Sequence, residues 1–132
     1  MELSLRVDAE RSLLVVTYTG DFSLAEAEAT FLDLLASLVE HNLTRVLVDG
    51  QQLIGQPELL ERFYYGNFVA DAVNRTVNDT GCAMPTFAYV LQEPTLDPNR
   101  FGELVAIKRG MRVKAFDNLQ HARWWLGLTG SE

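Results

Sequence analysis

The feature that most constrains the fold is a regular alternation of short β-branched runs with amphipathic helical stretches. Two apolar segments, 3–7 and 13–18, flank a short polar turn, and further strand-like runs follow at 45–49, 86–91 and 112–116. Helical patterns separate these later runs, and strand–helix–strand units require right-handed crossovers between parallel strands. The sequence therefore predicts an α/β fold of order ββαβαβαβα, with a mostly parallel sheet, helical crossovers and an N-terminal antiparallel hairpin.

Local signals place the ends of the expected helices. Residues 23–26 (Ser-Leu-Ala-Glu) form a capping-box pattern at the start of a helix that continues to residue 40. Pro57 suits the first turn of a second helix, which is expected to end near residue 78. Asp97 and the proline after it predict the start of a third helix, which Gly110 should end in the left-handed conformation. Asp117 is expected to cap the last helix.

Composition and charge restrict the class of protein. The chain has 132 residues, of which 48% are hydrophobic and 22% charged, and this predicts one domain over residues 1–132 with its own apolar core. A net charge of −7 argues against nucleic-acid binding, which requires a basic surface. No run approaches the roughly 20 apolar residues that cross a bilayer, so membrane insertion is not expected. The N-terminus lacks a signal-peptide pattern, and a cytoplasmic location is expected.

Four segments of the chain carry a family resemblance: Val46–Asp49, Gly102–Ala106, Arg109–Phe116 and Ala122–Leu126. Their succession is similar to that of the SpoIIAA-like family, small bacterial proteins related to STAS domains, which include the anti-sigma-factor antagonists. The resemblance implies successive βα units with the hairpin strand at one edge. It also implies a regulatory role and kinship with CRAL-TRIO lipid-transfer domains.

The chain departs from this family at one functional position. STAS antagonists typically carry a phosphorylatable Ser or Thr just after the strand that ends in Asp. Here Asp49 is followed by Gly-Gln-Gln-Leu-Ile-Gly, which contains no hydroxyl group. The phosphorylation switch of the anti-sigma antagonists is therefore not expected in this chain.

The carboxyl ends of the expected parallel strands define a candidate ligand loop. Ligands of open parallel sheets bind outside these ends, and segments 49–55, 92–99 and 116–117 should gather there. In one interpretation their polar groups hold a small polar ligand. In the other, Asp49 accepts backbone hydrogen bonds and the glycines make a turn, a role that recurs throughout α/β proteins. The candidate residues are Asp49, Gly50, Gln51, Gln52, Glu93 and Asp117.

The sequence offers no constellation typical of catalysis. The two histidines, His41 and His121, have no Cys, His or carboxylate at metal-ligand spacing, and no phosphate-binding or nucleophile-elbow motif occurs. Cys82 lies in an apolar stretch without a cationic neighbour to activate it. We therefore predict a protein that is not an enzyme and carries no cofactor or metal. A small enzyme of unknown class stays as a further alternative.

The second helix combines two apolar faces. One stripe, predicted to face the sheet, contains Leu59, Phe63, Gly66, Ala70, Val73 and Val77. The opposite side is also apolar, and such a helix is buried from two directions. Either this side forms a homodimer interface, or the third helix or a loop covers it, or the core stripe is a different one. The candidate interface residues are Tyr64, Tyr65, Phe68 and Ala72.

These observations lead to one main functional prediction and one principal alternative. The main prediction is a non-enzymatic regulatory domain that binds a protein partner and self-associates through the second helix. The alternative is a carrier or sensor of a small apolar or lipid-like ligand. A pocket lined by Phe and Tyr would favour the alternative.

Overall fold

The computed structural model describes residues 1–128. The strands in this range are β1 (Glu2–Asp8), β2 (Leu13–Asp21), β3 (Arg45–Ile54), β4 (Thr86–Leu91) and β5 (Arg112–Phe116). The helices are α1 (Leu24–Glu40), α2 (Leu59–Thr80), α3 (Phe101–Lys108) and α4 (Leu119–Trp125), and a short 3-10 turn, Ala9–Arg11, joins β1 to β2. The predicted order ββαβαβαβα is confirmed.

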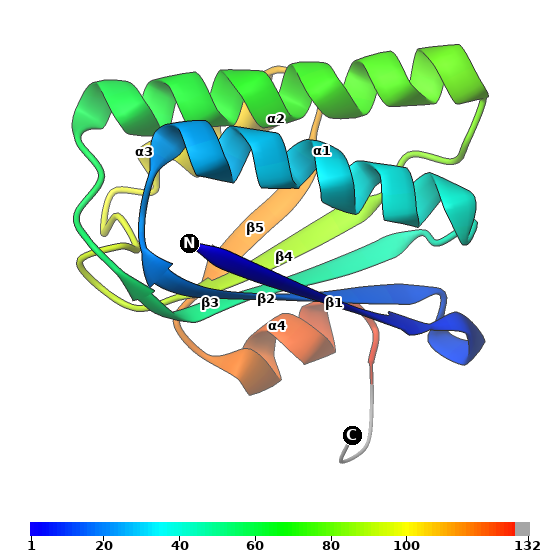
Figure 1. Ribbon diagram of the computed structural model, residues 1–132, viewed down its shortest axis with the longest axis horizontal. Coiled ribbons are helices and arrows are strands. Elements are labelled where there is room, and N and C mark those ends of the chain that lie inside the picture. Colours follow the sequence, from blue (N-terminus) through cyan, green and yellow to red (C-terminus); the bar gives the residue numbers. More distant parts are fainter. Residues whose placement is uncertain (129–132) are drawn as a thin grey trace.

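The strands form one sheet in the order β1-β2-β3-β4-β5. Strand β1 is antiparallel to β2, and the other neighbouring pairs are parallel. Helices α1, α2 and α3 cover one face of the sheet, whereas the short α4 lies on the other face (Figure 1). The edge strands are therefore β1 and β5.

Two apolar cores follow from this layering. The larger lies under α1 and α2 and is centred on Phe31, whose ring packs against Phe87 at 5.6 Å between ring centroids. The smaller lies between the sheet and α4. Trp124 and Trp125 are adjacent on α4 and lie in different surroundings: Trp124 is 78% exposed, whereas Trp125 packs against Phe116.

A close approach of two helices shapes the end of the larger core. A Cβ atom on Gly66 of α2 would lie 2.6 Å from the carbonyl oxygen of Gly102 in α3, so only glycine fits there. Helix α3 ends as predicted, with Gly110 at a φ of +92°, a conformation that glycine adopts without strain.

The starts of α3 and α4 differ from the predicted ones. Helix α3 begins at Phe101, because the Asp97 carboxylate accepts hydrogen bonds from the amides of Asn99 and Phe101 and stabilises a turn before the helix. Helix α4 is capped by the side chain of Asn118, not by Asp117. Both errors arise because several adjacent residues can cap a helix, and the path of the chain selects one of them.

Candidate functional site

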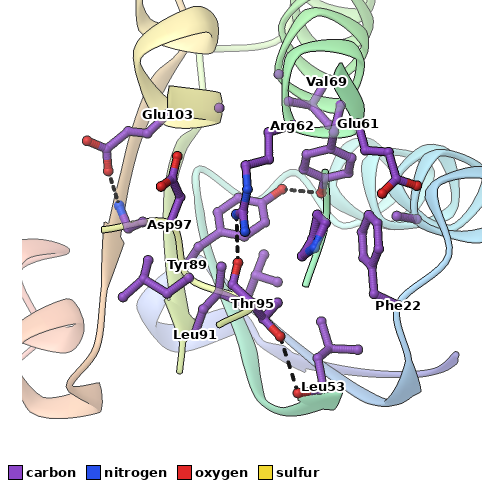
Figure 2. A pocket seen from close by; sticks show the side chains of 18 of the residues that line it. Phe22, Leu53, Glu61, Arg62, Val69, Tyr89, Leu91, Thr95, Asp97 and Glu103 are labelled. Atoms are coloured by element: carbon purple, nitrogen blue, oxygen red, sulfur yellow. Dashed lines mark hydrogen bonds between the residues drawn. The ribbon is translucent and has the colours of Figure 1, made fainter. Parts of the chain in front are cut away.

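A cavity of about 140 Å³, partly open to solvent, lies between the sheet and the helices α2 and α3. Figure 2 shows side chains from both layers around it. Most of the wall is apolar carbon. Its apolar lining includes Phe22, Val48, Leu53, Val69, Leu91, Leu96, Ala106, Val113 and Ala115.

Three tyrosines, here called the cavity tyrosines, contribute hydroxyl groups: Tyr18 from β2, Tyr65 from α2 and Tyr89 from β4. The hydroxyl oxygens of Tyr65 and Tyr89 lie 2.7 Å apart, and Figure 2 shows this hydrogen bond inside the cavity. The Tyr18 hydroxyl lies 2.7 Å from that of Thr30, which itself donates to the Glu26 carbonyl. Tyr18 is therefore the donor to Thr30.

Burial keeps the cavity tyrosines neutral. Loss of solvent around each ring is the largest cause, and it raises the pKa of Tyr18, Tyr65 and Tyr89 above the ordinary tyrosine value. For Tyr65 the nearby Tyr89 raises the pKa further. All three side chains therefore present protonated hydroxyl groups to the cavity at neutral pH.

Arg62 of α2 fastens the loop after β4 to the rim of the cavity. Its guanidinium donates to the carbonyl oxygens of Thr95 at 2.8 Å and Pro94 at 3.0 Å. Thr95 is buried and donates its hydroxyl to the Gly55 carbonyl at 2.8 Å, which ties the same loop to the end of β3. Hydrogen bonds thus join two segments far apart in the sequence at this wall of the cavity, and Figure 2 shows Thr95 between Arg62 and Leu53.

The exposed edge of β5 forms another part of the wall. Arg100 donates to the Ala115 carbonyl oxygen and the Glu103 carboxylate accepts from the Ala115 amide. These side chains satisfy backbone groups that an edge strand would otherwise leave open to pairing with another chain. Both charged groups are thereby engaged within the protein.

Two carboxylates of the wall, Glu61 and Asp97, also have partners. The Glu61 carboxylate accepts from the amide of Glu58 at the start of α2. Burial acts to raise the pKa of Asp97, but hydrogen bonds from the amides of Phe101 and Asn99 and the positive charges of Arg62 and Arg100 together outweigh it, and the pKa is lowered. The cavity therefore combines an apolar wall and neutral hydroxyls with charged side chains that are hydrogen-bonded within the protein.

The candidate ligand loop takes a different form from the predicted one. The expected loop at 49–55 is wrong, because β3 continues to Ile54 through a register shift opposite Thr17–Thr19. Asp49 accepts from the Gln51 amide at 3.1 Å and from the Gln51 side chain at 3.0 Å, which is the structural role that the sequence allowed for. Glu93 is exposed, and Asp117 offers its carbonyl to Gln92. The cavity wall contains other residues, and ligand binding by the candidate set Asp49, Gly50, Gln51, Gln52, Glu93 and Asp117 stays a prediction.

The core stripe predicted for α2 is confirmed at Gly66, Ala70 and Val73, which are buried, but it is wrong at the start of the helix, where Leu59 is 63% exposed. Phe63, expected in the core, is 37% exposed, and Tyr65, expected on the outer face, is packed against the core with its hydroxyl in the cavity. Phe68 and Ala72 are half-buried against the same core, and of the candidate interface residues Tyr64 alone is exposed, at 51%. The physical reason is that α2 contacts both α1 and α3, and its buried residues share one apolar cluster with residues of the strands.

Few features of the sequence indicated the cavity. Tyr18 and Tyr89 occupy inward positions of strands whose other inward residues are mostly aliphatic. A tyrosine hydroxyl at such a position needs a hydrogen-bond partner, so the two tyrosines were the signal in the sequence for a polar group inside the core. Within residues 1–128 no cluster of His, Cys, Asp and Glu suits a metal ion, and no described helix has the length and apolar character to cross a membrane.

Comparison with known proteins gives a match among the solved structures. No protein-family model and no curated protein sequence matches the chain. The crystal structure of an anti-sigma factor antagonist from Mycobacterium paratuberculosis matches with a TM-score of 0.54 and 13% sequence identity, over 96% of this chain and 95% of that one. The chain shares the anti-sigma antagonist fold. This supports the predicted STAS/SpoIIAA-like architecture, and identity this low relates the two proteins by fold alone.

Proposed function

We propose that the chain is a non-enzymatic binding domain that holds a small, mainly apolar molecule in the cavity between the sheet, α2 and α3. The observation that carries this proposal is the cavity itself, with its apolar wall and neutral hydroxyls. Apolar cavities of about 150 Å³ bind molecules the size of benzene. At about 140 Å³ the cavity suits a single ring better than a lipid, because pockets for larger ligands are typically 300–1,000 Å³.

The raised pKa values of the cavity tyrosines and the hydrogen bonds of the charged side chains support binding in preference to catalysis. General acid–base chemistry needs a group that can exchange a proton near neutral pH. The cavity tyrosines have raised pKa values, and the charged side chains of the wall are held by hydrogen bonds within the protein. Regulation is proposed to follow from occupancy of the cavity, without a phosphorylation switch, because residues 50–55 contain no hydroxyl side chain.

Blocking the cavity provides the test. Val113 lies on the wall, so Val113→Phe should fill part of the space and lower the affinity for small aromatic compounds by about tenfold or more, since overpacking costs on the order of 1–3 kcal/mol. Val15 belongs to the smaller core on the other face of the sheet, and Val15→Phe is the matched control. Calorimetric titration with acetophenone and isopropenylbenzene measures the affinity, and circular dichroism checks the fold. Saturable binding that both variants retain equally would place the ligand elsewhere, and a wild type that binds neither compound would refute the proposal.

A second proposal, association with a protein partner, has its own observation. Large apolar side chains are exposed on α2 and α3, among them Leu60 at 63%, Tyr64 at 51% and Leu104 at 49%. Phe63 and Phe101 stack across the two helices beside them, with 6.5 Å between ring centroids. Exposed clusters of this kind mark interaction sites. We propose that this surface binds a second copy of the chain in a two-fold homodimer, the commonest symmetry of soluble oligomers.

The homodimer makes a direct prediction about mass in solution. Leu60 and Tyr64 are one helical turn apart, so Leu60→Lys with Tyr64→Ser alters one exposed face of α2 without touching the core. Interface anchors contribute about 2 kcal/mol each, and the double variant should be monomeric at concentrations where the wild type is dimeric. Sedimentation measures the mass, and Trp124→Ser on the exposed side of α4 is the control that should stay dimeric. A wild type that is monomeric at high micromolar concentration would contradict this proposal.

A further inference from the structure

The hydrogen bond between Tyr65 and Tyr89 leaves one hydrogen unused. Two hydroxyl groups carry two hydrogens, and a bond between them engages one. Their oxygens are 2.7 Å apart, and among residues 1–128 no second hydrogen bond joins either hydroxyl. Both side chains line the cavity. One O–H of this tyrosine pair is therefore a donor without a protein acceptor, on the wall of an apolar space.

The remaining polar groups of the wall do not compete for the same role. Tyr18 donates its hydrogen to Thr30, and the charged side chains are engaged by backbone groups. A charged ligand would lose its hydration on entering an apolar space, which costs several kcal/mol or more, and the charged side chains around the cavity are already hydrogen-bonded within the protein. A wholly apolar ligand would separate the free O–H from water without satisfying it. The wall is thus matched to a neutral molecule with one acceptor.

We propose that the cavity binds a neutral, ring-sized molecule bearing a single hydrogen-bond acceptor, such as a ketone or ether oxygen, and that the Tyr65–Tyr89 pair donates to that atom. This inference rests on the function proposed above and adds the chemical class of the ligand. The hydroxyl pair fixes the orientation: the acceptor points toward β4 and α2, and the ring lies against the apolar wall.

Two isosteric probes test the acceptor requirement. Acetophenone and isopropenylbenzene have nearly the same shape and differ in a carbonyl oxygen against a methylene group. The wild type should bind acetophenone about tenfold more tightly than isopropenylbenzene. Bound isopropenylbenzene leaves the buried O–H donor without an acceptor, and the free-energy cost of that corresponds to a ratio of about this size. Calorimetric titration of both compounds against the same protein measures the ratio.

Variants of the pair locate the donor. In Tyr65→Phe or Tyr89→Phe the remaining hydroxyl has no partner and still donates to the ligand, so the preference for acetophenone should persist. In the double variant the donor is gone, and the two probes should bind with equal affinity. A preference that survives in the double variant would overturn the assignment to these tyrosines.

The outcomes separate this inference from the function on which it rests. If the wild type binds both probes equally, the acceptor requirement is overturned while the binding function stands. If the wild type binds neither probe, both are overturned. The comparison in the wild type needs no variant, so it decides the question even where the double substitution weakens the fold.

Discussion

Substitution of Gly66 by alanine is expected to destabilise the protein by about 2 kcal/mol or more. In an exposed helix the same change would be favourable by about 1 kcal/mol, because glycine is a poor helix former. Here the new Cβ would lie 2.6 Å from the Gly102 carbonyl oxygen and 3.1 Å from the Val105 side chain. A backbone oxygen cannot rotate away, so α2 and α3 must separate; overpacking of this kind is expected to cost about 3 kcal/mol, and the propensity gain of about 1 kcal/mol offsets only part of it.

The consequence extends to the cavity, because Gly102, Glu103 and Ala106 of α3 form part of its wall. Gly66→Ala should therefore lower both the urea midpoint of unfolding and the affinity for the ring-sized probes. Asn78→Ala, at an exposed position of the same helix, is the matched control and should be neutral or slightly stabilising. If Gly66→Ala were as stable as the control, the two helices would not approach as closely as described.

Alkaline pH is expected to unfold the protein through the cavity tyrosines. Burial raises the pKa of Tyr18, Tyr65 and Tyr89 above the ordinary value of 10.0. The folded state therefore holds these protons more tightly than the unfolded chain does. The stabilisation is fully present below pH 10 and is lost as the pH rises above it, toward the raised values, by about 1.4 kcal/mol per pH unit for each tyrosine.

Two signals recorded together test this expectation. The chain contains four tyrosines, so in a Tyr64→Phe background the three cavity tyrosines are the only source of tyrosinate absorbance. Above pH 10 that absorbance should appear together with the loss of the circular dichroism signal, in one cooperative transition. Adding Tyr65→Phe and Tyr89→Phe should make the loss of stability with pH about one third as steep. Tyrosinate absorbance that rises while the native circular dichroism persists would show that the hydroxyls reach solvent in the folded protein.

Sequence patterns determined the elements of this protein because their causes are local. The β-branched runs specify β2, β3 and β4, and Ser23 caps α1 through its own side chain, 3.3 Å from the Glu26 amide. Gly110 ends α3 because it bears a positive φ without strain. Alternation of strands with helices then leaves few possible topologies, and the observed sheet follows from them.

The tertiary structure decided what the sequence left open, because the deciding contacts join residues far apart in the chain. The extension of β3 beyond Asp49 depends on pairing with the last residues of β2, and the buried face of α2 depends on its contacts with α1 and α3. The cavity depends most on such contacts. Tyr18, Tyr65 and Tyr89 lie on three elements, and neither their shared burial nor the hydrogen bond of the pair is encoded by the spacing of residues within any one of them.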